Sequence, residues 1–279
     1  DYLKKNKIVC MADLDTRHIA SIIRNKGVMK ACIIHSEKGI DKAKKELIKY
    51  PGIAGSELAS VVSARKKYIF KENVFQHKHD KLNKGSAFKV VAYDFGVKSN
   101  ILRILNSMGC DVHVVPARTT AKEILNLKPD GIFLSNGPGD PEPCEFAIES
   151  IKELFDCNIP IFGICLGHQL IALASGARTE KMKYGHHGAN HPVIDVKTRK
   201  VMITSQNHGF VVNEDSLPNT FKVTHRSLFD NTIQGIMHKK YPIFSFQGHP
   251  EACPGPQDVN YLFKNFIDFM KKSKNAKKK

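Results

Sequence analysis

A cysteine between two glycines is the residue of this sequence best suited to covalent chemistry. Cys165 lies in the run Gly-Ile-Cys-Leu-Gly, after a short apolar segment and before a segment with helical spacing. We predict that Cys165 occupies a sharp strand-to-helix turn, because flanking glycines let the backbone bend and let a substrate approach. The start of a helix favours the thiolate, the form that attacks carbonyl carbons. The alternative is a buried and unreactive cysteine.

A histidine and a glutamate nearer the end of the chain could activate that thiol. His249 and Glu251 follow the alternating apolar segment 243–246. His249 could accept the thiol proton and later donate it to a leaving amine, while Glu251 holds the other ring nitrogen. Alone, His-Pro-Glu is a common loop composition, so this interpretation depends on Cys165.

A loop rich in glycine and proline supplies candidate oxyanion donors. Residues 136–141, Asn-Gly-Pro-Gly-Asp-Pro, follow an apolar segment. We predict that the backbone N–H groups of Gly137 and Leu166 stabilise the negative oxygen that forms when a thiolate attacks an amide carbon. By itself the loop is equally consistent with a plain turn.

Together these segments resemble the class I (triad) glutamine amidotransferases and, among them, the small subunits of carbamoyl-phosphate synthases. The resemblance covers most of the chain and rests on residues 92–96, 134–141, 163–169, 206–210 and 246–251. The last four of these segments recur across the class. The segments that indicate the small subunit of carbamoyl-phosphate synthase are residues 185–192, 225–230 and 253–256.

The resemblance implies a role for each site residue. Cys165 would attack the side-chain amide of L-glutamine and release ammonia, and water would then hydrolyse the glutamyl thioester with His249 as the base. Glu251 would orient His249, and Gly137 with Leu166 would form the oxyanion hole. The family's glutamine contacts fall on Gly137, Gly139, Leu166, Gln169, Asn207, Gly209 and Phe210.

The resemblance also implies a large partner subunit. In the family this partner uses ATP and bicarbonate to make carbamoyl phosphate, for arginine and pyrimidine synthesis, and receives ammonia through an internal tunnel. A sealed route keeps ammonia unprotonated and reactive. This chain contains no GxxxxGK[ST] phosphate loop and no dinucleotide fingerprint. We therefore expect no cofactor in it, with ATP and Mg on the large subunit.

Two other functions remain open. The chain could be a glutamine amidotransferase that serves another acceptor, in a purine, pyrimidine or chorismate pathway. It could also be a non-catalytic regulatory or scaffolding subunit, because it opens within what resembles the later part of the family's amino-terminal domain. The start of that domain, including a serine that helps to bind glutamine in the family, has no counterpart here.

Hydrophobic periodicity predicts an α/β fold from residue 88 onward. Alternating strands and helices indicate a doubly wound, mostly parallel, flavodoxin-like sheet covered on both faces, with active residues at the carboxyl ends of strands. Strands are expected at residues 89–93, 112–115, around 132, 159–162, 201–204, 221–224, 232–236 and 243–246. Helices are expected at 100–108, 121–127, 144–155, 166–176 and 259–270.

The predicted domain order has four parts. Residues 1–70 are expected to be the remainder of an amino-terminal α/β domain, and the polar, lysine-rich residues 71–86 a linker. Residues 87–272 would form the amidotransferase domain and residues 273–279 a basic tail.

Composition limits the partners and the compartment. The 279 residues include seven cysteines without a CxxC pair and carry a net charge of +16. Scattered cysteines favour a reducing cytoplasm over a disulfide framework or a zinc site. The lysines are dispersed without an RNA-binding motif, so we expect no nucleic-acid binding, and no apolar run is long enough for a membrane span. The histidines 186, 187 and 191 lack a nearby carboxylate or cysteine at ligand spacing, so we predict no metal site.

Overall fold

The computed structural model describes residues 1–74 and 88–276, which form two compact units, Asp1–Tyr50 and Pro51–Lys279. The division falls before the boundary expected at residue 70, because residues 51–74 attach to the second unit. Strand β1 (Tyr68–Phe70) in that stretch pairs antiparallel with β3 (Cys110–Pro116). Most of the expected linker, 71–86, and the last three residues of the expected tail lie outside the described residues.

The first unit contains short helices and no strand in residues 1–50. Its elements are α1 (Tyr2–Lys5), α2 (Thr16–Lys26), the 3-10 helix η1 (Glu37–Gly39) and α3 (Ile40–Lys49). The side chain of Asp15 caps α2 by accepting a hydrogen bond from the backbone of His18 at 2.8 Å. Neither α2 nor α3 buries a residue, so these residues do not build a core of their own.

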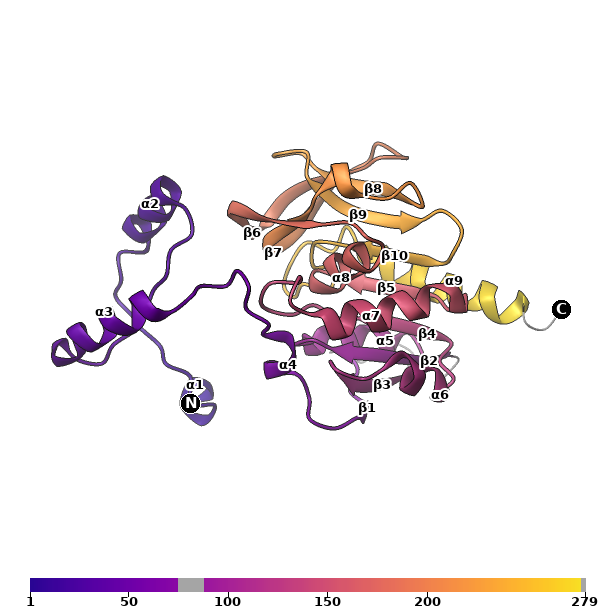
Figure 1. Ribbon diagram of the computed structural model, residues 1–279, viewed down its shortest axis with the longest axis horizontal. Coiled ribbons are helices and arrows are strands. Elements are labelled where there is room, and N and C mark those ends of the chain that lie inside the picture. The colour runs from indigo at the N-terminus through magenta and orange to yellow at the C-terminus, as the bar shows by residue number, and fades with distance from the viewer. Residues whose placement is uncertain (75–87, 277–279) are drawn as a thin grey trace. The chain divides into compact units, whose positions relative to one another are not determined.

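The second unit is built on one ten-stranded mixed sheet (Figure 1). Its order is β1-β3-β2-β4-β5-β10-β9-β8-β6-β7. The parallel core consists of β3, β2 (Phe88–Asp94), β4 (Gly131–Leu134), β5 (Ile161–Ile164) and β10 (Ile243–Phe246). The antiparallel extension consists of β9 (Ile233–His238), β8 (Phe221–Ser227), β6 (Thr179–Asp195) and β7 (Val201–Val212). The predicted α/β class is confirmed, with the parallel part confined to five adjacent strands.

Helices cover both faces of the parallel core, because its strands are apolar on both sides. On β2, Val91 and Tyr93 pack in one cluster with helices on one face, while Val90 and Ala92 pack in a second cluster on the other face. The first cluster includes α6 (Ala121–Asn126), α7 (Glu145–Leu154) and α8 (Leu166–Ala174). The second includes α5 (Ser99–Ser107) and α9 (Tyr261–Ala276). The remaining elements are α4 (Ala59–Val62), η2 (Phe155–Cys157) and η3 (Glu214–Ser216).

The longest strand, β6, was not expected from the sequence. Its polar, histidine-rich and glycine-rich residues lack the alternation that marks a strand, and residues 185–192 suggest a loop instead. The strand forms because β7 pairs with it along most of its length, with register shifts on either side of the segment that begins at His186. None of the helices in residues 1–74 and 88–276 combines the length and apolar content of a membrane span.

A glycine at the start of α8 lets that helix pack closely against the sheet. A Cβ atom on Gly167 would lie 2.2 Å from the carbonyl oxygen of Leu134 and 2.8 Å from the Leu134 carbonyl carbon. Both are backbone atoms of a central strand and cannot move aside. Gly167→Ala is therefore expected to destabilise the protein by about 1–3 kcal/mol, as overpacked cores do, and to lower the melting temperature measured by circular dichroism.

A matched substitution gives the control for this prediction. At Gly209, in the same unit as Gly167, a Cβ atom would meet nothing within 4 Å, so Gly209→Ala is expected to change stability by less than about 0.5 kcal/mol. An unchanged melting temperature in Gly167→Ala would contradict the close approach of α8 to β4.

Candidate active site

Cys165 occupies the sharp turn between β5 and α8, as predicted. Its backbone adopts φ 53° and ψ −103°, a conformation that costs of order 1–3 kcal/mol for a residue with a side chain. The turn is held by a hydrogen bond from the Cys165 N–H to the carbonyl of Phe246 at 3.0 Å. That carbonyl belongs to the last residue of β10, the parallel neighbour of β5. The thiol therefore emerges at the carboxyl end of the sheet, next to the strand that leads to His249.

His249 and Glu251 form a buried hydrogen-bonded pair beyond the end of β10. The distance from His249 Nδ1 to Glu251 Oε1 is 2.7 Å, and the two residues are 2% and 1% exposed. Because a carboxylate oxygen only accepts, the bond leaves Nδ1 protonated and Nε2 as the nitrogen that can exchange a proton with a thiol.

The electrostatics of His249 couple it to Cys165. Burial by itself would lower the pKa of the imidazole, but the thiolate of Cys165, a hydrogen bond to it and the Glu251 carboxylate outweigh burial and raise the pKa to about 10. Burial likewise opposes ionisation of Glu251, yet its bond to His249 lowers the pKa of that carboxyl. The site thus favours a protonated imidazole beside the ionised Glu251 carboxylate.

This coupling predicts how the pKa of His249 responds to loss of the thiolate. Serine at position 165 stays neutral, so Cys165→Ser removes the largest contribution that raises the His249 pKa. We expect the pKa of His249 to fall in Cys165→Ser, measured by NMR titration of labelled imidazole. A pKa that stays the same or rises would show that the ring does not face residue 165.

A lysine that the sequence analysis missed completes the ionic part of the site. Lys98 Nζ lies 3.4 Å from Glu251 Oε1 and 3.2 Å from His249 Nδ1. Asn100 donates from its side-chain amide to the backbone carbonyl of Glu251 at 2.6 Å. Both residues lie just after β2, at the carboxyl end of a parallel strand. Because active residues gather at such ends, this position could have identified them as candidates from the sequence.

Two backbone N–H groups remain available beside the thiol. Gly137 lies against Leu166, since a Cβ atom on Gly137 would be 2.6 Å from Leu166 Cδ2 and 2.2 Å from the Phe95 carbonyl oxygen. Leu166 is the first residue of α8, so its N–H has no partner within the helix. In the part of the chain that the structure describes, neither N–H donates a hydrogen bond. Free donors in this position suit an oxyanion hole.

Most of the other predicted substrate residues lie on α8, which begins directly after Cys165, and on β7, which approaches the thiol at Asn207. Cys165 Sγ is 3.9 Å from the backbone carbonyl oxygen of Asn207. The Gln169 amide donates to the carbonyl of Phe210 at 2.9 Å and to Gln247 Oε1 at 3.1 Å. A Cβ atom on Gly209 would meet nothing within 4 Å, so the backbone of β7 is open at that position.

Gly139 has different neighbours from the other predicted site residues. Its φ is +96°, and a Cβ atom there would lie 2.7 Å from the carbonyl oxygen of Ser56. The next residue, Asp140, donates its N–H to Ser56 and accepts the Gly55 N–H at 2.8 Å. Gly139 therefore lies against the segment before α4.

The other histidines near the site do not compete with His249 as the base. Burial lowers the pKa of both His168 and His208 to about 3, so both rings are neutral near pH 7. His186 donates to Asp230, a carboxylate that the sequence analysis did not connect with it. Among residues 1–74 and 88–276, no group of three or more metal-binding side chains is placed to hold an ion.

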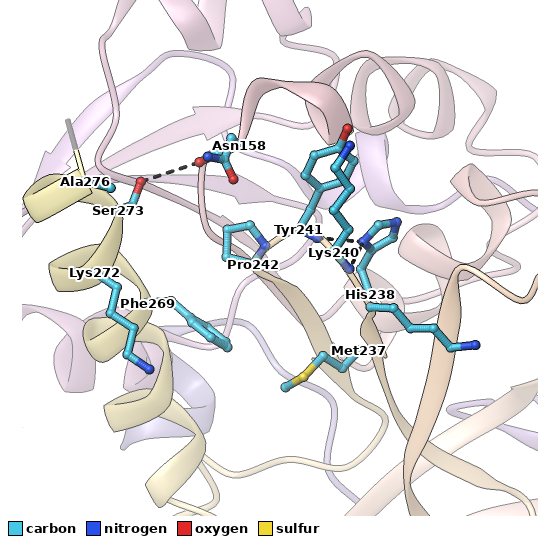
Figure 2. Close-up of a pocket in the computed structure, with 11 residues that line it drawn as sticks. Asn158, Met237, His238, Lys240, Tyr241, Pro242, Phe269, Lys272, Ser273 and Ala276 are labelled. Carbon is cyan, nitrogen blue, oxygen red and sulfur yellow. Dashed lines mark hydrogen bonds between the residues drawn. The ribbon is translucent and has the colours of Figure 1, made fainter. Parts of the chain in front are cut away.

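A pocket of about 370 Å³ lies away from these residues, between α9 and the turn that joins β9 to β10 (Figure 2). Its apolar wall includes Met237, Pro242 and Phe269. Lys240, one of its lysines, lies with its ammonium group 5.0 Å from the centre of the Tyr241 ring. The pocket adjoins the start of β10, whereas His249 follows the end of that strand, so the two sites are separate.

Comparisons with known proteins agree with this fold. The glutamine amidotransferase class-I family profile matches residues 91–269. The crystal structure of a putative GMP synthase protein from Thermoplasma acidophilum superimposes with a TM-score of 0.61 and 28% identity, covering 68% of this chain and 98% of that one. Together, the fold and the family match place this chain among the class I glutamine amidotransferases.

Sequence relatives show which family within this class includes the chain. A carbamoyl phosphate synthase small chain from Thioalkalivibrio sulfidiphilus is 55% identical over 97% of this chain and 72% of its own length. One from Neisseria meningitidis is 53% identical over 99% of this chain and 74% of its own length. The chain belongs to the family of carbamoyl phosphate synthase small chains.

Proposed function

We propose that this chain is the glutaminase subunit of a carbamoyl phosphate synthase, acting through a Cys165-His249-Glu251 triad. The observation that carries the proposal is the position of the thiol, on a strained turn at the end of β5, beside the buried His249–Glu251 pair that follows β10. The family of the chain supports glutamine as the substrate.

In the proposed reaction, the Cys165 thiolate attacks the side-chain amide carbon of L-glutamine. The N–H groups of Gly137 and Leu166 hold the resulting oxyanion. The imidazolium of His249 protonates the amide nitrogen, so that the C–N bond breaks and ammonia leaves from a glutamyl thioester. His249, now neutral, takes a proton from water, whose oxygen attacks the thioester and releases glutamate and the thiolate.

The remaining predicted residues would bind the substrate. Gln169 lies on α8, and Asn207, Gly209 and Phe210 lie on β7, the strand that approaches the thiol at Asn207. The backbone and amide groups of these residues suit a zwitterionic amino acid. Gly139 would lie near the charged end of the glutamine, and the segment against which it packs would support that end.

The ammonia would pass to a large subunit that uses ATP and bicarbonate to form carbamoyl phosphate for arginine and pyrimidine synthesis. This chain would need no cofactor for its own step, because each proton transfer uses His249. All seven cysteines are free, which is consistent with a reducing compartment such as the cytoplasm.

The test combines this chain with the large subunit of a carbamoyl phosphate synthase and supplies glutamine labelled with ¹⁵N in the amide, ATP and bicarbonate. The proposal predicts glutamate release and ¹⁵N in carbamoyl phosphate in equal amounts. Glutamate release without transfer to bicarbonate, but with transfer to another acceptor, would favour another amidotransferase. Absence of glutamate release from the complex would favour the non-catalytic alternative.

A further inference from the structure

Two adjacent histidines on β6 face two adjacent residues on the strand that borders the thiol. In the antiparallel pairing of β6 with β7, His186 is opposite His208 and His187 is opposite Asn207. Directly opposite residues lie on the same face of a sheet and interact as cross-strand pairs. His187 therefore shares a face with Asn207, whose backbone carbonyl lies 3.9 Å from Cys165 Sγ.

The backbone of β6 is shaped around this pair of histidines. Register shifts occur between Lys181 and His186 and again between Gly188 and His191. Glycines with positive φ lie at either end of the paired segment, Gly185 at +72° and Gly188 at +156°. Bulges of this kind re-aim side chains next to functional sites.

Each histidine side chain makes a hydrogen bond, and the two side chains lie on opposite faces of the strand. The buried His186 bonds through Nε2 to Asp230 Oδ2 at 2.8 Å. The exposed His187 bonds through Nδ1 to Asn207 Oδ1 at 2.8 Å. Because an amide oxygen only accepts, Nδ1 of His187 carries the proton.

That bond determines what the Asn207 side chain can offer a substrate. Because Oδ1 accepts from His187, the orientation of the amide is fixed, and Nδ2, which can only donate, is held at a set position from which it can make new hydrogen bonds. A donor at this position suits a carbonyl or carboxylate oxygen of a bound amino acid. Without His187 the amide could rotate and present its oxygen, which would repel such a group.

We propose that His187 is a positioning residue for glutamine binding, which fixes the amide of Asn207 so that its Nδ2 faces an oxygen of the substrate. The inference rests on the proposed glutaminase function. His187 itself does not touch the reacting atoms, so its loss should weaken binding and leave the chemical step nearly unchanged.

The kinetic test uses the complex with the large subunit. His187→Ala is expected to raise the KM for glutamine about 3- to 10-fold, the effect of one hydrogen bond, with kcat changed less than about twofold. His187→Asn, which keeps a donor near the position of Nδ1, should restore most of the KM. Lys183→Ala, an exposed change on the same strand, is the matched control and should behave as the wild type.

A double-mutant cycle separates positioning from a structural role. If His187 acts through Asn207, then His187→Ala should have no further effect on KM in an Asn207→Ala background. An unchanged KM in His187→Ala, or the same increase in both backgrounds, would overturn the inference.

A spectroscopic readout keeps the inference testable even if a variant folds poorly or if glutamine is not the substrate. Nitrogen-15 NMR of labelled histidine should show His187 of the wild-type chain with its proton on Nδ1, and Asn207→Ala should shift it toward the Nε2 tautomer. A wild-type His187 protonated only on Nε2 would overturn the inference. Failure of the wild-type complex to release glutamate would instead overturn the proposed function.

Discussion

Cys165→Ser is expected to lower the rate of glutamine hydrolysis by at least about 1000-fold, because the reaction depends on a thiolate and a serine hydroxyl does not ionise near neutral pH. Serine is close to cysteine in size, so the turn between β5 and α8 should keep its geometry. The measurement, made at saturating glutamine, is glutamate release by the complex with the large subunit.

Two controls separate loss of the nucleophile from loss of the fold. Cys157→Ser, at a half-exposed cysteine in η2, should hydrolyse glutamine at the wild-type rate. The complex that contains Cys165→Ser should still form carbamoyl phosphate from added ammonia, because that step bypasses the thiol. If Cys165→Ser hydrolyses glutamine at more than about a tenth of the wild-type rate, Cys165 is not the nucleophile.

His249→Asn is expected to have an effect of similar size, again about 1000-fold or more on kcat. Asparagine cannot donate a proton to the leaving ammonia or take one from water, and it leaves the buried Glu251 without its imidazole. Lys98, 3.4 Å from the carboxylate, should still hold Glu251 in place, so the folded structure should persist.

The pH dependence of the His249→Asn variant separates two roles of His249, which are to ionise Cys165 and to protonate the leaving nitrogen. Alkaline pH can generate the thiolate without His249, but it cannot supply the proton that the leaving nitrogen needs. Hydrolysis by His249→Asn should therefore stay low at pH 9. Recovery to the wild-type rate at pH 9 would mean that His249 serves only to ionise Cys165.

The central part of this structure could be predicted from the sequence because its signals are local. Apolar runs that alternate with helical periods specify β2, β4, β5 and β10, and the glycines beside Cys165 specify the turn. Since the carboxyl ends of parallel strands meet at one edge of the sheet, the order of elements already suggests that Cys165 and His249 lie together.

The parts that the sequence did not predict depend on contacts between distant residues. Strand β6 has no alternation of its own and forms through its pairing with β7 and β8. Lys98 is an ordinary loop lysine until the fold brings it to Glu251, 153 positions later in the chain. Nothing in the sequence connects His187 with Asn207, 20 positions later, and only the pairing of β6 with β7 brings the two side chains together.

The most direct test of the triad is the reactivity of the seven thiols toward an electrophilic glutamine analogue, followed by mass spectrometry of the peptides. We predict a single adduct, on Cys165, whose formation is slowed by L-glutamine and by His249→Asn. An unlabelled Cys165, or labelling of Cys165 that glutamine does not slow, would contradict the proposed active site.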